Sequence, residues 1–145
     1  MPRSLGIDLG DARVGVAISD ELNFLAHPLE TIVVKNTPAL PRILTLIAEK
    51  NIDTIIVGVP RNMDGSHGPA SEKSKAFIET LKQKAPCRVL PWDERLTTVS
   101  AQRSLREAGR KAHEQKSIID QAAAQIILQS WMDSQPPLPE PESNG

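Results

Sequence analysis

The fold is decided by the stretch Leu5-Gly-Ile-Asp-Leu-Gly-Asp-Ala-Arg-Val-Gly-Val-Ala-Ile-Ser-Asp20. Apolar residues alternate with small or polar ones on both sides of residues 10–13, which is the period of two typical of β-strands. Four residues cannot make a parallel crossover, so the pattern predicts an antiparallel hairpin. Asp8 then lies inside the first strand near its end, where a carboxylate loses hydration unless a cation or several donors compensate. We interpret Asp8 as a ligand; the alternative is an acid that only caps the turn.

Composition restricts the class of protein. The 145 residues are 39% hydrophobic and 24% charged, proportions typical of one globular domain. The single cysteine, Cys87, excludes an internal disulfide and favours a reducing compartment. No apolar run reaches the ~20 residues of a membrane span. We therefore expect a cytoplasmic protein without a membrane partner.

The rest of the chain alternates between strand and helix patterns. An apolar run at residues 54–59, rich in β-branched residues, predicts a strand buried inside a parallel arrangement. His27-Pro28 is predicted to break the chain before a strand. The remaining predictions are strands at 29–34 and 88–92, helices at 38–50, 70–84, 99–108 and 118–132, and a mobile connection at 109–116. We expect one α/β domain over residues 1–132 and, because four prolines follow, a disordered tail over 133–145.

Three acids are predicted to meet at one edge of this sheet. Asp8 ends the first strand, Glu94 follows the last strand, and Asp120 lies among small residues in the final helix. Adjacent residues of a strand point to opposite faces, so only one of Asp93 and Glu94 can face Asp8. Asp120 has a second interpretation, as an acid favoured by the dipole of a helix N-terminus. Carboxylates without His or Cys partners suit Mg²⁺ or Mn²⁺, and a pair of such ions can promote phosphodiester hydrolysis.

Basic and polar residues supply candidates for phosphate contacts. The net charge is −1, but the segment 95–116 is basic, which indicates either a phosphate-binding face or a solvated helix. In the loop after the buried strand, Arg61, Asn62 and Ser66 are candidates for phosphate contacts, and Asp64-Gly65 is equally consistent with turn chemistry alone. The six basic residues of the segment are Arg95, Arg103, Arg106, Arg110, Lys111 and Lys116.

Four motifs together resemble the YqgF family. They are Gly6-Ile-Asp-Leu-Gly10 with Arg13-Val-Gly-Val-Ala17 and Ser19-Asp20, Val57-Gly-Val-Pro-Arg-Asn-Met-Asp-Gly-Ser66, Asp93-Glu-Arg-Leu-Thr-Thr98, and Ile119-Asp-Gln-Ala-Ala123. The resemblance extends from residue 4 to about residue 132. Members of the family are described as nucleases of pre-16S ribosomal RNA and as Holliday-junction-resolvase-like proteins.

The resemblance implies a ribonuclease-H-like fold, with a mixed five-stranded sheet whose first three strands are antiparallel. It implies a hydrolase that trims the 5′ end of the small-subunit rRNA precursor in ribosome biogenesis. Asp8, Glu94 and Asp120 are then the catalytic and metal-binding positions, with Asp93 a possible substitute for Glu94. The motif positions that become candidates for nucleic-acid contacts are Arg13, Arg61, Asn62, Arg95, Thr97 and Thr98.

Other functions compete with this interpretation. Sugar kinases and actin-like ATPases begin similarly, but they are much longer. A resolvase of branched DNA and a binding protein without catalysis both remain possible. The expected partners are RNA, namely pre-16S rRNA, or branched DNA, and also ribosomal particles. We expect a monomer or a homodimer.

Overall fold

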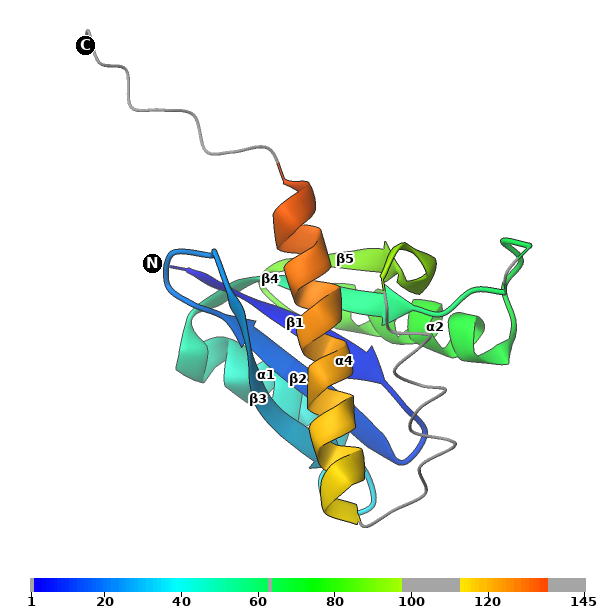
Figure 1. The fold of residues 1–145 in the computed structure, drawn as a ribbon. Coiled ribbons are helices and arrows are strands. Elements are labelled where there is room, and N and C mark those ends of the chain that lie inside the picture. Colours follow the sequence, from blue (N-terminus) through cyan, green and yellow to red (C-terminus); the bar gives the residue numbers. More distant parts are fainter. Residues whose placement is uncertain (1, 63, 98–112, 136–145) are drawn as a thin grey trace, which may run out of the picture.

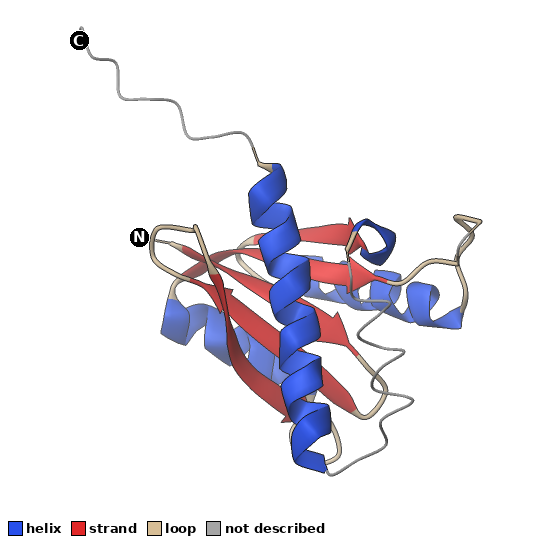
Figure 2. Cartoon of the chain, in the orientation of Figure 1, coloured by secondary structure: helices blue, strands red, loops and turns tan. Residues whose placement is uncertain are grey.

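The computed structural model describes residues 2–62, 64–97 and 113–135. For residues 113–119 it describes the backbone alone. The described chain forms a five-stranded sheet with helices on both faces (Figures 1 and 2). The strand order is β3-β2-β1-β4-β5. The bounds are β1 (Arg3–Leu9), β2 (Arg13–Ser19), β3 (Ala26–Val33), α1 (Ala39–Lys50), β4 (Ile52–Val59), α2 (Pro69–Lys84), β5 (Arg88–Asp93), the 3₁₀ helix η1 (Glu94–Leu96) and α4 (His113–Ser134).

The sheet is mixed, and its first three strands are antiparallel. β1 pairs with β2 and β2 with β3 in antiparallel register, whereas β4 runs parallel to both β1 and β5. The hairpin that joins β1 to β2 closes where the amide of Gly10 donates to the carbonyl of Arg13 at 3.0 Å. The predicted ribonuclease-H-like arrangement is confirmed.

Strand β3 begins earlier than predicted. His27-Pro28 does not break the chain, because β3 already pairs with β2 at Ala26. The proline is accommodated at an edge strand, where its missing N–H costs no ladder bond, and a bulge lies beside it: Val16 pairs with Glu30, but Ala17 pairs with Pro28. Sequence reasoning treated the proline as a breaker without knowing that the strand lies at the edge.

Helix α4 is longer than predicted. It begins at His113 and ends at Ser134, so residues 113–116 belong to a helix and not to a connection, and the helix passes the predicted domain boundary at residue 132. The predicted helix at 99–108, residues 109–112 and most of the predicted tail lie outside the described residues. Asp120 consequently lies two turns inside α4, where the dipole of the helix N-terminus has little effect.

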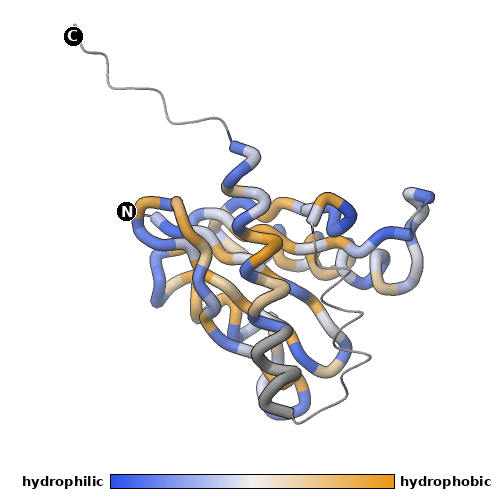
Figure 3. The backbone as a smooth tube through the Cα atoms, viewed as in Figure 1, coloured by the Kyte–Doolittle hydropathy of each residue, from blue (hydrophilic) through white to orange (hydrophobic). Residues whose placement is uncertain are grey.

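Hydrophobic residues are frequent along the strands (Figure 3). Their side chains form two apolar layers, one on each face of the sheet. One lies between the sheet and helices α1 and α2, and includes Leu5, Ile7 and Val57. The other lies between the sheet and α4, and includes Ala17, Ile56 and Ile127. None of the helices in the described ranges is both long enough and apolar enough to cross a membrane.

Glycines on the α4 face let the helix lie directly against the strands. A Cβ atom on Gly6 would lie 2.6 Å from the Cβ of Leu128, one on Gly15 would lie 2.0 Å from the carbonyl oxygen of Asp120, and one on Gly58 would lie 2.4 Å from Cδ1 of Ile127. At Gly6 and Gly15 the clash includes backbone oxygens of α4, so a side chain there requires a shift of the helix, whereas at Gly58 the side chains of Ile127 and Glu94 would have to move. The glycines therefore determine how closely α4 approaches the sheet.

A row of glutamines joins α4 to the edge strand. Gln121 Nε2 donates to Thr31 Oγ1 at 3.1 Å, and Gln125 Nε2 donates to the carbonyl of Ala26 at 2.9 Å. Gln129 accepts the amide of Ala26 at 2.8 Å. These residues recur every four positions, so they lie on one face of the helix. They connect α4 to β3 along its length.

Candidate active site on the α4 face of the sheet

Asp8 and Asp120 occupy the same part of the α4 face. Asp8 is 2% exposed, and its neighbour Ile7 points into the opposite layer, so the alternation of β1 turns Asp8 toward α4. Asp8 pairs in register with Gly15, and a Cβ on Gly15 would lie 3.2 Å from the Cβ of Asp120. The absence of a side chain at Gly15 thus lets Asp120 lie against the strand position that is paired with Asp8.

Glu94 enters this face from the end of β5. Glu94 is 2% exposed, and its Oε2 would lie 2.8 Å from a Cβ atom on Gly58. Gly58 belongs to β4, the strand next to β1, and pairs with Trp92. Three buried carboxylates, from β1, η1 and α4, therefore face the same side of the sheet.

Asp120 is also held by an arginine. Nε of Arg13 donates to Oδ2 of Asp120 at 2.7 Å, across 107 positions of sequence. Their side chains are 23% and 4% exposed, so the pair is largely shielded from solvent. Arg13, predicted to contact nucleic acid, instead bonds one of the three acids, Asp120.

Asp93 points away from the cluster. It pairs with Val59, whose side chain belongs to the layer of α1 and α2, while Glu94 faces α4. The carboxylate of Asp93 contacts Arg95 Nη2 at 2.8 Å and Arg61 Nη1 at 3.3 Å. Hydrogen bonding to Arg95 holds the pKa of Asp93 below its ordinary value. The two adjacent acids therefore have different surroundings and different partners.

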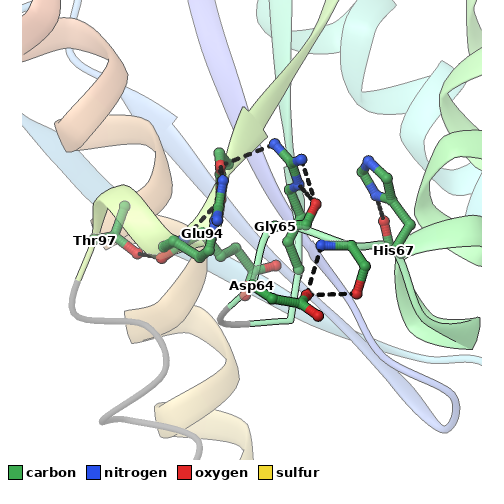
Figure 4. Close-up of polar contacts among 10 residues, drawn as sticks. Asp64, Gly65, His67, Glu94 and Thr97 are labelled. Carbon is green, nitrogen blue, oxygen red and sulfur yellow. Dashed lines mark hydrogen bonds and ion pairs between the residues drawn. The ribbon is translucent and has the colours of Figure 1, made fainter.

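The loop between β4 and α2 folds on itself beside η1. Figure 4 shows Asp64, Gly65 and His67 on this loop, together with Glu94 and Thr97 of the segment after β5. Nη1 of Arg95 would lie 3.2 Å from a Cβ on Gly65. Gly65 has φ +88°, a conformation that favours glycine. Oδ1 of Asp64 accepts the amide of Ser66 at 2.8 Å and its hydroxyl at 2.6 Å, and the bonds from Ser66 lower the pKa of Asp64. The turn chemistry predicted for Asp64-Gly65 is present.

The predicted phosphate-contact residues that the structure describes have partners within the chain. Asn62 Nδ2 donates to Ser66 Oγ at 3.0 Å, and Arg61 Nε donates to the carbonyl of Gly65 at 3.0 Å. Thr97 donates its hydroxyl to the carbonyl of Glu94 at 2.8 Å. Arg61 and Arg95 retain side-chain exposures of 30% and 36%, so solvent and ligands reach them. Thr98 lies outside the described residues.

The donor types suit a hard divalent cation, because three buried carboxylates face one side of the sheet. Within the part of the chain that the structure describes, however, no three His, Cys, Asp or Glu side chains lie close enough together to hold an ion. Asp120 contacts Arg13 in this arrangement. Binding of a cation would therefore require the Arg13–Asp120 pair to rearrange.

Sequence reasoning did not assign a role to Gly15 or Gly58. Both lie inside strands, where glycine weakens pairing and often marks a close approach of other groups. That signal was visible in the sequence, but the group that approaches each glycine was not. Gly15 accommodates the backbone of Asp120, and Gly58 accommodates Glu94 and Ile127.

A mixed sheet in this strand order, with buried acids beneath the final helix, defines a domain of the ribonuclease-H-like class. Solved structures with this fold align over most of the chain. A Thermus thermophilus RuvC in complex with a Holliday junction substrate has a TM-score of 0.53 at 16% identity, covering 91% of this chain and 94% of that chain. The fowlpox virus Holliday junction resolvase has a TM-score of 0.52 at 14% identity, covering 92% and 99%.

The chain belongs to the RuvX family, described as "Holliday junction resolvase", which matches residues 2–134. Relatives carry the curated name "Putative pre-16S rRNA nuclease". One from Acetivibrio thermocellus is 47% identical over 135 residues, covering 91% of this chain and 96% of the relative. One from Myxococcus xanthus is 42% identical over 136 residues, covering 93% and 90%. RuvX and YqgF are two names of one family, so the family predicted from the sequence motifs is confirmed. The predicted enzyme class, a nuclease, is confirmed as well.

Proposed function

We propose that the protein is a divalent-metal-dependent nuclease that processes the 5′ end of pre-16S rRNA, with Asp8, Glu94 and Asp120 as its catalytic carboxylates. The observation that carries the proposal is the burial of these three acids on one face of the sheet, at 2%, 2% and 3% exposure. Burying a carboxylate is costly unless a cation or donors compensate. A fold stabilised only by packing would not need three of them on one face.

The acidic and the basic residues of the site would have different roles in hydrolysis. Asp8, Glu94 and Asp120 would hold Mg²⁺ or Mn²⁺. When bound, such an ion supplies a Lewis acid that lowers the pKa of water and neutralises charge that develops on the phosphate. Arg13 holds Asp120 in the metal-free arrangement and would release it to the ion, and the guanidinium groups of Arg61 and Arg95 would contact phosphates.

Hydrolysis breaks one bond of the phosphodiester and forms another. A water oxygen bonds to phosphorus and the 3′ oxygen leaves with a proton, so no further reactant is needed. The buried carboxylates would hold the cation, whose positive charge offsets the negative charge of the phosphate. Thr97 closes η1 by donating its hydroxyl to the backbone carbonyl of Glu94.

The choice of RNA rests on the relatives, whose curated names specify pre-16S rRNA and which align over more than nine-tenths of this chain. Branched DNA is the second candidate, because the description of the family itself specifies Holliday junctions. A cytoplasmic location, contact with ribosomal particles, a monomeric or homodimeric state, and a domain of residues 1–132 with a tail of 133–145 are part of the proposal.

The test compares two substrates under matched conditions. The purified protein is incubated with 5′-extended small-subunit rRNA precursor and with a four-way DNA junction, each with Mn²⁺, with EDTA, and with an Asp8→Asn variant. We expect metal-dependent cleavage of the RNA that is lost in the variant. Cleavage of the junction alone would favour the resolvase function. Salt-sensitive RNA binding without cleavage of either substrate would refute catalysis.

A further inference from the structure

The chain presents two adjacent acids at the end of β5, and only one of them faces the buried cluster. Glu94 packs over Gly58 on the α4 face. Asp93 shares its register position with Val59 and faces the other layer. Both are carboxylates next to the same strand end, so the sequence leaves open which one serves the metal.

The carboxylate of Asp93 is fully used by the protein. A carboxylate offers about four acceptor sites, and four donors occupy those of Asp93. Oδ1 accepts the backbone amide of Arg95 at 2.9 Å. Nε of Arg95 lies between the two oxygens, 3.2 Å from Oδ1 and 3.1 Å from Oδ2, and Oδ2 also accepts Arg95 Nη2 at 2.8 Å and Arg61 Nη1 at 3.3 Å. Both oxygens of Asp93 are therefore engaged by donors of the protein.

These bonds determine the conformation of the segment that carries Glu94. The bond to the amide of Arg95 makes Asp93 the N-cap of η1, and a cap of this kind satisfies a donor that would otherwise be free. At the other end, Thr97 donates both its amide, at 3.1 Å, and its hydroxyl, at 2.8 Å, to the carbonyl of Glu94. The backbone of Glu94 is thus held from both sides.

The same carboxylate joins η1 to the loop that follows β4. Arg61 bridges the two segments, because its guanidinium donates to Asp93 and to the carbonyl of Gly65. Nη1 of Arg95 reaches within 3.2 Å of the Cβ position of Gly65. Through its bond with Arg61, Asp93 therefore connects the two segments that follow the carboxyl ends of the parallel strands β4 and β5.

We infer that Asp93 is a positioning residue, which fixes Glu94 through η1 and fixes Arg61 and Arg95 through ion pairs, and that it is not a metal ligand. The inference rests on the proposed function in one respect, namely that Glu94 binds the metal. The contacts that Asp93 makes with the two arginines are independent of any metal.

The first experiment measures Mn²⁺ binding by titration calorimetry on four full-length variants. Glu94→Gln should weaken binding at least about tenfold. Asp93→Ala should weaken it about fivefold, the effect of one lost N-cap on the segment that holds Glu94. Asp93→Asn should restore most of the affinity, since asparagine caps as well as aspartate. Asp64→Asn is the matched control, because it removes a carboxylate charge from the neighbouring loop between β4 and α2, where Asp64 bonds Ser66.

Equal loss of Mn²⁺ binding in Asp93→Asn and Glu94→Gln would overturn the inference, because it would make Asp93 a ligand. Wild-type affinity in Asp93→Ala would overturn it as well, since the cap would then have no effect on Glu94.

A second measurement needs no metal. In ¹H–¹⁵N spectra recorded in EDTA, the Nε–H signal of Arg95, whose Nε donates to Asp93, should be observable in the wild type and in Glu94→Gln, and should be broadened or lost in Asp93→Ala. The Nε–H signal of Arg61 is the internal control, because that group donates to the carbonyl of Gly65. If Asp93→Ala leaves the Arg95 signal unchanged, the positioning role is refuted. If the wild type binds no Mn²⁺ while these signals behave as expected, the proposed metal function fails and the arginine contacts stand.

Discussion

Replacement of Gly15 by alanine should displace helix α4 at the point where it carries Asp120. The added Cβ would lie 2.0 Å from the carbonyl oxygen and 2.5 Å from the carbonyl carbon of Asp120. The helix must move outward by about 1.4 Å to restore an ordinary contact, which is an overpacking strain of about 1–3 kcal/mol. Reduced freedom of the unfolded chain offsets about 0.4–1 kcal/mol of this cost. We expect a net loss of about 1–2 kcal/mol, or roughly 3–6 °C in Tm.

The same displacement should affect catalysis more than stability. A misplacement of about 1 Å in a catalytic group can reduce the rate about 10²-fold. The assay compares thermal unfolding and metal-dependent cleavage of the RNA precursor for the wild type and Gly15→Ala. The matched control is Gly68→Ala, since a Cβ on Gly68 would meet nothing closer than 3.7 Å. Equal Tm and equal rates for Gly15→Ala and Gly68→Ala would refute the claim that Gly15 sets the position of Asp120.

Three further predictions concern parts of the molecule remote from the acid cluster. The hydrogen bond and ion pair with Arg42 hold the pKa of Glu30 below its ordinary 4.5. The pair stabilises the fold by under about 1 kcal/mol, as expected for a partly exposed pair, and this stabilisation is present above pH 4.5 and declines as the pH falls. The Tm difference between wild type and Glu30→Gln should therefore shrink in acid, and a constant difference would contradict this. Burial raises the pKa of the Cys87 thiol, so alkylation by iodoacetamide at neutral pH should be slower than that of a cysteine peptide, and a faster reaction would count against a structural role. Phe24 is 66% exposed, so Phe24→Ser should change the free energy of unfolding by less than about 0.5 kcal/mol in urea titrations, and a larger loss would show that the ring is covered.

The strand pattern was predictable because its causes are local. The alternation in β1 and β2 and the four-residue turn between them require an antiparallel hairpin whatever the rest of the chain does. The continuous apolar run of β4 likewise indicates a strand covered on both faces, and it lies between β1 and β5. The errors occurred where position in the sheet decides the outcome, as at Pro28, which an edge strand tolerates.

The candidate site was predictable in its residue types but not in its contacts. Strand alternation predicted that only one of Asp93 and Glu94 faces Asp8. In the structure Glu94 begins η1, and the acid that faces α4 depends on how η1 turns and on the face that α4 covers. Arg13 and Asp120 are separated by 107 positions, and no periodicity relates two residues so far apart. Their contact exists because α4 crosses the strand that begins with Arg13.

The sequence by itself determined the hairpin, the parallel interior of the sheet, the family motifs and the three acids, since each depends on residue type and short-range spacing. Only the tertiary structure decided that Gly15 and Gly58 receive α4 and Glu94, that Arg13 holds Asp120, and that Asp93 serves two arginines. The physical reason is that these contacts arise from the packing of a distant helix and loop against the sheet. Close packing of such elements depends on every surface in the layer at once.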